Sequence, residues 1–336
     1  MKIRLVGHLG EPVMYIGPRS PWEKFIKELK QSGNIIATSN FGENIDVLIA
    51  NSHSENAIRE CASSNVPKSR RILILWEPPI IDHKRHSAQV LQNYGLVYSP
   101  SFDWAKNSET KYFLWPQLKL SQKNESLETW AKRKNKSVMV LANKFSATRG
   151  ELYSLRRKII TITERNSLLD LYGAKWNLGK AYDYRHYFGK LVRTPLKLIN
   201  YKSITNLGVY HKNYLGLVED KTKIYQEYRI ILVMENSAEY ISEKFFDAFE
   251  GNAIVIYVGP NNKKYSIPDA AAIFVPHDAQ KIRSKITEIQ RMSSIEQFQL
   301  VQDQQKAILK ISDEWYGEKV LSKLAQDINY SIQNKI

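Results

Sequence analysis

Residues 228–259 read YRIILVMENSAEYISEKFFDAFEGNAIVIYVG, and this stretch decides the fold. Its two ends, YRIILVM and AIVIYVG, are continuous apolar runs of strand length, which is typical of strands buried on both faces of a parallel sheet. Between them, three apolar residues of SEKFFDAFE share one helical face, and Gly251 follows as a helix stop. The stretch therefore predicts a strand, a crossover helix and a second parallel strand.

The same alternation of strands and helices extends outward over most of the chain. One helix is marked by Ser20-Pro21 as N-cap and first helical position and by Gly33 beyond its end. The tail is expected to be helical from about residue 278, with Leu321, Leu324 and Ile328 on one buried face. Besides the quoted stretch, the expected strands are IRLV (3–6), IIATS (35–39), DVLIAN (46–51), RILILWE (71–77), LVYSP (96–100), YFLWPQ (112–117), SVMVLAN (137–143), LLDLYG (168–173) and AAIFVP (271–276), and the expected helices lie near 20–33, 54–64, 149–164, 214–226 and 242–250.

This order of elements predicts an α/β protein with two Rossmann-like, doubly wound domains that face each other across a cleft, followed by helices. We expect an N-terminal domain over 1–130, a C-terminal domain over 136–300, and C-terminal helices over 301–336 that pack back across the domains. The basic run at 132–136 reads as a solvated linker between the domains. Residues 174–212, rich in Tyr, Lys and Arg, give no clear pattern.

Composition narrows the classes of protein and of partner. The 336 residues are 43% hydrophobic, enough for a core in each domain. No apolar run approaches a membrane span, MKIRLVGHLGEP lacks a signal-peptide core, and a single cysteine, Cys61, offers neither a disulfide nor a zinc motif. We therefore expect a cytoplasmic protein. The net charge of +15 favours an anionic partner: nucleic acid, a membrane surface or a phosphorylated substrate.

The polar residues ENSAEY follow a buried strand and precede a helix. In open α/β sheets, ligands bind at the carboxyl ends of the strands, and a helix N-terminus suits phosphate. Lys244 in the first turn opposes the helix dipole unless an anion is shared between them. The alternative is that Ser242 caps the helix, Glu243 complements the dipole and Lys244 points into water.

These residues resemble the donor-site signature of family 10 glycosyltransferases, the α1,3/1,4-fucosyltransferases, in its bacterial form. The likeness lies in Glu-Asn-Ser, then YISEKFFDA, then IVIYVG. It extends upstream through YLGLVEDKTKIYQEYRIILVM and downstream through YVGPNNKKYSIPDAAAIFV. ANKFSATRGELYSLRRKI and LLDLYG also resemble family blocks, and LWEPP at 75–79 resembles the Glu-Ser-Pro of the acceptor side. The second half of the chain matches well and the first half only thinly.

The resemblance implies a GT-B-like enzyme in which the N-terminal domain handles the acceptor and the C-terminal domain binds GDP-fucose. It further implies inverting transfer of fucose to a glycan such as a lipopolysaccharide or surface oligosaccharide. Three positions depart from the family pattern, Ala142, Pro78 and Ser242, and the first two bear on acceptor handling. The implied donor-binding residues are Arg149, Asn236, Tyr240, Glu243 and Lys244, and the implied general base is Glu77.

The chemistry of these residue types fits the implied reaction. A departing diphosphate needs a divalent metal or cationic side chains, and the sequence has no Asp-x-Asp pair for a metal. Arg149 and Lys244 would then bind the diphosphate, with no cofactor required and a divalent metal at most stimulatory. Glu77 would take the proton of an acceptor hydroxyl, with His83 and His86 as alternative bases at an exposed helix start.

Other roles and functions stay open. Tyr240 could instead pack against the sheet edge, and Glu243 could simply complement the helix dipole. P-loop, dinucleotide, zincin and esterase motifs are absent from the sequence. The first alternative function is the same fold with another nucleotide sugar. The second is a basic nucleic-acid-binding protein, which we do not expect because no such motif is present. The positive charge could also hold the protein on the anionic inner face of a membrane.

Overall fold

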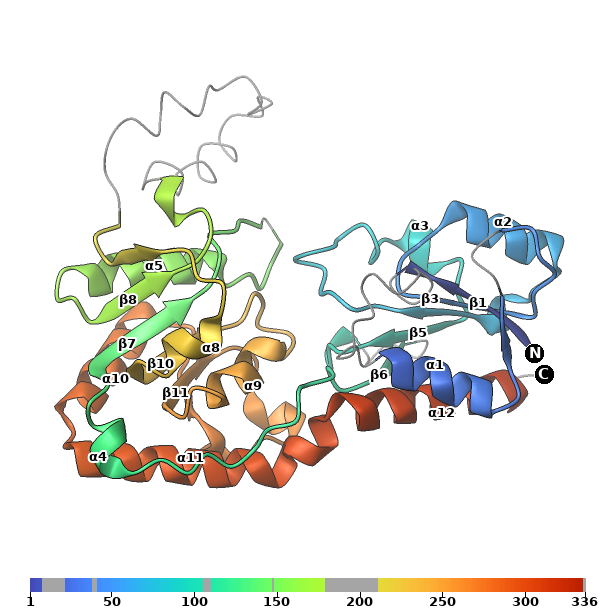
Figure 1. The fold of residues 1–336 in the computed structure, drawn as a ribbon. Helices are drawn as coiled ribbons and strands as arrows, with labels where there is room; N and C mark the ends of the chain where they lie inside the picture. Colours follow the sequence, from blue (N-terminus) through green and yellow to red (C-terminus); the bar gives the residue numbers. More distant parts are fainter. Residues whose placement is uncertain (8–21, 38–40, 105–109, 147, 179–210, 335–336) are drawn as a thin grey trace, which may run out of the picture. The chain divides into compact units, whose positions relative to one another are not determined.

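A computed structural model describes residues 1–7, 22–37, 41–104, 110–146, 148–178 and 211–334. The chain divides into two compact units (Figure 1). Unit 1 comprises Met1–Lys119, Glu239–Glu243 and Ile311–Ile336, and unit 2 comprises Leu120–Ala238 and Lys244–Lys310. The division after Lys119 comes earlier than the domain end expected at residue 130.

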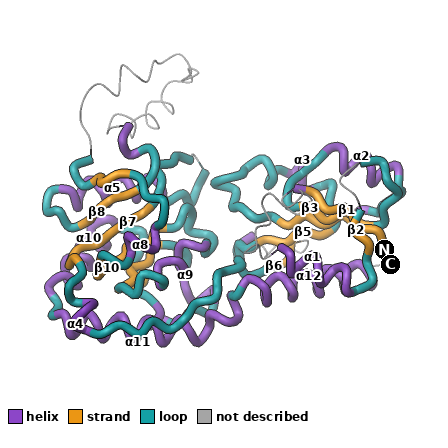
Figure 2. The backbone as a smooth tube through the Cα atoms, in the orientation of Figure 1, coloured by secondary structure: helices purple, strands orange, loops and turns teal. Residues whose placement is uncertain are grey.

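Unit 1 is built on a parallel sheet of six strands in its described part. The order across the sheet is β2-β1-β3-β4-β5-β6, so the chain leaves β1 on one side and later continues from β3 on the other. Figure 2 draws the strands in orange. This is a doubly wound sheet, as expected. The strands are β1 (Lys2–Val6), β2 (Ile35–Ile36), β3 (Val47–Ala50), β4 (Arg71–Ile74), β5 (Leu96–Ser99) and β6 (Thr110–Tyr112).

Helices cover both faces of the unit 1 sheet because successive strand residues point to opposite sides. Ile72 and Ile74 of β4 lie in one apolar cluster with α1 (Trp22–Gln31) and α12 (Gly317–Asn334). Leu73 lies in a second cluster with α2 (Glu55–Ser63). The strand is therefore buried on both faces. A short helix, α3 (Ala88–Leu91), precedes β5.

Unit 2 is built on a second parallel sheet of six strands in its described part. Its order is β12-β11-β10-β7-β8-β9. The two runs that decided the prediction are the neighbours β10 and β11, with β10 bounded as expected. The strands are β7 (Lys134–Val140), β8 (Leu169–Tyr172), β9 (Tyr214–Gly216), β10 (Tyr228–Met234), β11 (Ile254–Val258) and β12 (Ile273–Phe274).

One face of the unit 2 sheet packs on α4 (Leu127–Trp130), α5 (Tyr153–Glu164), α10 (Ala279–Arg291) and α11 (Ser294–Trp315), and the other packs on the crossover helix α9 (Glu243–Phe249). The first face shares an apolar cluster with its helices. On the other face, Phe245 of α9 packs edge-on against Tyr257 of β11, with ring centroids 4.7 Å apart. Another short helix, α8 (Lys221–Tyr225), leads into β10.

The basic run at 132–136 is not a linker, which corrects the expectation. Its second half opens β7, and its charges are paired with carboxylates of neighbouring elements. Arg133 lies 2.5 Å from Glu125, Lys134 lies 2.9 Å from Glu227, and Lys136 pairs with Asp170. Composition suggested a solvated connector because two of these partners, Glu227 and Asp170, lie far away in the sequence.

Several other element boundaries differ from the expected ones. The helix expected near 214–226 is in fact strand β9 followed by the short α8. The helix expected from 149 begins at Tyr153, so Arg149 precedes it. RILILWE is strand only as far as Ile74, and YFLWPQ contributes only Tyr112 to β6. These errors fall at edge strands and element ends, where short polar and apolar residues mix and the periodic signal is weakest.

The end of the chain is helical, as expected. α10, α11 and α12 follow one another, and Leu321, Leu324 and Ile328 are all buried. Gly33 ends α1 with φ +79°, as predicted, whereas Ser20 and Pro21 lie outside the described residues. Most of the unpatterned segment 174–212 also lies outside them. No helix in the described part of the chain is long and apolar enough to cross a membrane.

Candidate functional site

The candidate site lies where the strand order of unit 2 reverses. β7 and β10 are parallel neighbours, but the chain continues from β7 toward β8 on one side and from β10 toward β11 on the other. Two loops therefore diverge from the carboxyl ends of adjacent strands. In open α/β sheets, this is the position where ligands bind.

The two loops are joined directly to each other. The backbone N–H of Leu152 donates to the carbonyl of Asn236 at 3.0 Å, and that of Ala238 donates to Gly150 at 3.1 Å. An antiparallel bridge pairs Glu151 with Ser237 between these two bonds. Glu-Asn-Ser is thus held by the residues that immediately follow Arg149, although about 85 positions of sequence separate the two segments.

Arg156 is hydrogen-bonded to this junction, a role that was not predicted from the sequence. It projects from α5, is 2% exposed, and donates through Nη2 to the carbonyl of Met234 at 2.7 Å and to Oδ1 of Asn236 at 3.0 Å. Asn236, a predicted donor ligand, is itself 6% exposed. Its amide oxygen therefore acts within the loop junction, held by Arg156. The available sequence signal was spacing: Arg156 lies three and four positions before Ile159 and Ile160, which places it on the apolar face of the expected helix.

Arg149 and Lys244 lie on these two loops or directly after them. Arg149 is an exposed turn residue between β7 and α5. Lys244 is the second residue of α9, and its side chain is 21% exposed. Both cations therefore belong to the carboxyl-end edge of neighbouring strands. This placement is suited to an anion that spans the two loops.

Behind Lys244 lies a carboxylate that the sequence analysis also overlooked. Glu235, the first residue of Glu-Asn-Ser, is 0% exposed, and its Oε2 lies 3.8 Å from Nζ of Lys244. Its Oε1 accepts a hydrogen bond of 3.2 Å from the hydroxyl of Tyr257. The position of Glu235 directly after a buried strand was the only sequence signal for it.

The remaining donor-side residues differ in exposure. Glu243 begins α9 and is exposed. Tyr240 is 1% exposed, and its ring packs edge-on against Trp115 with centroids 5.6 Å apart, both in unit 1. This burial favours the packing role that the sequence left open for Tyr240.

Glu77 lies in unit 1, in a bend three residues beyond the end of β4. Its backbone carbonyl accepts a hydrogen bond of 2.8 Å from Nε2 of His86. Burial lowers the pKa of His86, which keeps the imidazole neutral near pH 7, with the proton on Nε2. The ring packs edge-on against Trp104 at 4.5 Å. His86 is thus part-buried in a turn, which corrects the expectation of an exposed helix start, whereas His83 is exposed.

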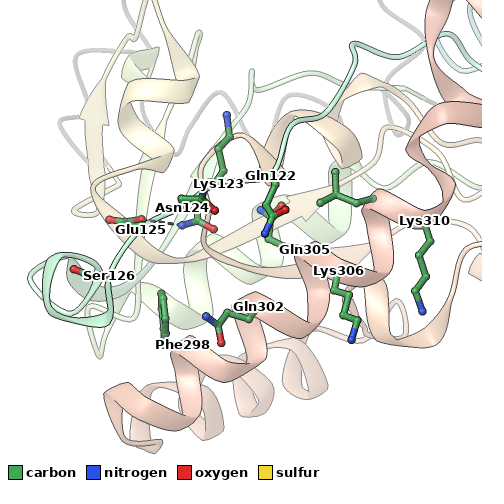
Figure 3. A pocket seen from close by; sticks show the side chains of 12 residues that line it. Gln122, Lys123, Asn124, Glu125, Ser126, Phe298, Gln302, Gln305, Lys306 and Lys310 are labelled. Carbon is green, nitrogen blue, oxygen red and sulfur yellow. Dashed lines mark hydrogen bonds between the residues drawn. The ribbon is translucent and has the colours of Figure 1, made fainter.

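A groove of about 960 Å³ lies elsewhere in unit 2, between residues 122–126 and α11 (Figure 3). Amide and lysine side chains line it, but none of the six predicted site residues does. Its buried amides already have partners, since Gln305 donates to Phe249 and Asn252 donates to Glu125. We therefore place the candidate site at the loop junction and not in this groove.

No protein-family model matches this sequence, and no curated protein matches it. Solved structures do match the fold. HepE from Anabaena, in complex with UDP and glucose, is 13% identical over 98% of this chain and 100% of its own, with a TM-score of 0.58. The Escherichia coli trehalose-6-phosphate structure bound with UDP-2-fluoro glucose is 11% identical over 98% and 99% of the two chains, with a TM-score of 0.56. A glycosyltransferase from Rickettsia africae is 12% identical over 100% and 99%, with a TM-score of 0.52. At these identities the likeness establishes the GT-B fold.

Proposed function

We propose that this protein is a glycosyltransferase that binds the diphosphate of a nucleotide sugar between Arg149 and Lys244. The observation that carries the proposal is the loop junction at the strand reversal of unit 2. There, the segments bearing both cations are hydrogen-bonded to each other beside adjacent strand ends. The fold shared with nucleotide-bound glycosyltransferase structures supports the same reaction class.

The two cations would play different parts at the diphosphate. The planar guanidinium of Arg149 can bind two phosphate oxygens at once, and the ammonium of Lys244 supplies a compact charge. Negative charge grows on the diphosphate as the glycosidic bond breaks, so fixed positive groups stabilise the transition state more than the ground state. In this proposal the reaction needs no metal ion. Glu243 would hydrogen-bond the hydroxyls of the donor sugar.

For the donor and the stereochemistry we propose GDP-fucose and inversion, most simply α1,3-fucosyl transfer. The support is the resemblance of YISEKFFDA and its flanking segments to family 10 enzymes. Glu77 would accept the proton of the attacking acceptor hydroxyl, and a single displacement would invert the anomeric centre. The acceptor would be a glycan such as a lipopolysaccharide.

A UDP-sugar is the second candidate donor. The name of the HepE structure includes UDP and glucose, and that of a trehalose-6-phosphate synthase structure refers to transfer with retention. The stereochemistry of the product therefore tests this second candidate, together with the role of Glu77 as base.

Calorimetric titration tests the proposal. GDP, UDP, GDP-fucose and UDP-glucose are added to the full chain in the presence of EDTA. We expect GDP to bind, and Arg149→Ala and Lys244→Ala each to weaken binding about tenfold or more because each removes a charge-assisted contact. Lys306→Ala, which removes an exposed lysine of the groove, serves as the matched control and should leave binding unchanged.

The outcomes separate the parts of the proposal. If none of the four ligands binds with or without divalent ions, the protein is not a nucleotide-sugar enzyme of this kind. Binding that appears only with added Mg²⁺ or Mn²⁺ overturns the metal-independent mechanism. If UDP binds more strongly than GDP, the proposed donor changes from GDP-fucose to a UDP-sugar. Nuclear magnetic resonance of the product's anomeric proton decides between inversion and retention.

The positive charge supports a further part of the proposal, peripheral contact with anionic membranes where lipid-linked acceptors lie. We expect the protein to sediment with phosphatidylserine vesicles at low salt and not with phosphatidylcholine vesicles. Equal sedimentation with both would contradict an electrostatic association.

A further inference from the structure

Glu235 introduces a negative charge directly behind the proposed diphosphate site. It lies at the carboxyl end of β10, and its carboxylate is 0% exposed and 3.8 Å from the ammonium of Lys244. A buried carboxylate is costly unless a cation or hydrogen-bond donors accompany it. Glu235 and Lys244 therefore form an ion pair in which the ammonium lies beside a fully buried carboxylate.

Glu235 is held firmly, so this pairing is a built feature of unit 2. Its backbone N–H donates to the carbonyl of Val258 at 2.9 Å, and its side chain accepts from Tyr257 at 3.2 Å. The Tyr257 ring packs edge-on against Phe245 of α9, with centroids 4.7 Å apart. Its hydroxyl lies so close to Gly259 that a Cβ added there would be 2.4 Å from the oxygen. The carboxylate is thus held beside the ammonium of Lys244.

This geometry has an electrostatic consequence for any anion bound by Lys244. The ammonium is shared between the buried carboxylate and the anion, so Glu235 offsets part of its attraction. A diphosphate leaving group that is held too strongly would delay product release, a step that limits many enzymes.

We infer that Glu235 is a positioning residue that acts through Lys244: it keeps the ammonium at the edge of the sheet and weakens its hold on the nucleoside diphosphate product. This inference rests on the proposed function, because it takes the Lys244 side chain as a phosphate ligand. Glu235 does not touch the substrate in this role. It sets the balance between capture of the donor and release of the product.

The variant Glu235→Gln tests the inference because glutamine keeps the size and the hydrogen bond from Tyr257 but removes the charge. We expect GDP to bind about 5- to 20-fold more tightly in calorimetry, since the ammonium is no longer shared. In turnover with the donor, both KM and kcat should fall, because release of GDP becomes slower. A purely structural role predicts the opposite, namely weaker GDP binding and a higher KM.

Two further variants show whether the effect runs through Lys244. In a Lys244→Met background, Glu235→Gln should change GDP affinity by less than about twofold, because the coupled partner is gone. Asp170→Asn is the matched control: Asp170 is a buried carboxylate of the same sheet, bonded to the Tyr228 hydroxyl at 2.8 Å and paired with Lys136. It should lower thermal stability without tightening GDP binding.

The failures of the inference and of the proposed function can be told apart. If the wild-type protein binds GDP and Lys244→Met weakens that binding, but Glu235→Gln leaves it unchanged or weakens it, the inference is wrong and the proposed site remains. Equal tightening by Glu235→Gln with and without Lys244 also overturns it. If the wild-type protein binds neither GDP nor UDP, the proposed function and the inference fail together.

Discussion

At the scale of single residues, the positions that matter most at the candidate site are those whose environment differs from what residue type suggests. Asn236 and Tyr240 are polar, yet they are 6% and 1% exposed, and Asn236 is held by Arg156. Arg149 and Glu243 are exposed. Arg149 therefore offers a sharper test of ligand binding than the buried Asn236 or Tyr240, because its side chain is exposed.

Substitution of Arg149 distinguishes planar, two-point binding from simple charge attraction. Arg149→Lys keeps the charge but loses the fork, so we expect most of the affinity lost in Arg149→Ala to be lost here too, about tenfold for GDP. Calorimetry with GDP measures this. Full retention of GDP affinity in Arg149→Lys would mean that Arg149 contributes only its positive charge to binding.

Glu77→Gln addresses the proposed base. We expect kcat/KM for transfer to fall by about 10²- to 10⁴-fold, with GDP affinity unchanged, because only proton removal is lost. His86→Gln is the companion variant: its amide can still donate to the Glu77 carbonyl in place of Nε2. It should lower the rate by less than about tenfold. A larger fall in His86→Gln than in Glu77→Gln would reassign the base.

Cys61 gives a residue-level prediction about pH. Burial raises the pKa of its thiol from 9.0 to about 11. The unfolded chain therefore ionises this thiol first, and the stability that it contributes is complete below pH 9 and is lost as the pH rises toward 11. Between pH 8.5 and 10.5, the free energy of unfolding should fall by about 2 kcal/mol more in wild type than in Cys61→Ala. Urea denaturation of both proteins checks this, and parallel pH curves would contradict it.

At the scale of elements, the buried strands were predicted well and the loops between them were not. β10 and β11 are recognisable because parallel strands covered on both faces must be apolar throughout. The start of β7 was mistaken for a linker because its charges are paired with carboxylates that only the fold brings near. A short edge strand such as β9 carries too few residues for a period to show.

Gly173 tests the close packing at the end of β8. It has φ +127°, and an added Cβ would lie 2.0 Å from the carbonyl oxygen of Leu141. Gly173→Ala should therefore cost about 3 kcal/mol or more in free energy of unfolding, through both strain and backbone displacement. Gly33→Ala is the matched control, with φ +79° but nothing within 4 Å. It should cost only about 1 kcal/mol. Equal costs in denaturant titrations would show that the clash relaxes.

At the scale of the whole molecule, the chain forms two units with separate cores, and its last helix returns to the first unit. α12 packs with α1 and the unit 1 sheet, whereas α10 packs on the unit 2 sheet. Stability should therefore be divided between units rather than shared by the whole chain.

Calorimetric unfolding tests this division. Leu321 in α12 and Ile282 in α10 are both 0% exposed, and replacing either by Ala should cost about 2–5 kcal/mol. We expect two unfolding transitions in wild type. Leu321→Ala should lower the midpoint temperature of one, and Ile282→Ala should lower that of the other. If both variants lower a single shared transition, the two units unfold as one.

The sequence by itself determined the fold class, and its resemblance to family 10 implied the two cations at the centre of the proposal, which stay a prediction. Apolar runs with helices between them allow little besides a parallel sheet, and polar residues after such a strand must lie at its ligand-binding end. Only the tertiary structure decided what surrounds those cations. Three features depend on the meeting of the two loops. They are the hydrogen bonds between the Arg149 loop and Glu-Asn-Ser, the hydrogen bond from Arg156 to Asn236, and the buried carboxylate of Glu235 near the ammonium of Lys244. The physical reason is that periodicity reports which face of an element is apolar, whereas hydrogen bonds and ion pairs act over a few ångströms between residues that are distant in the sequence.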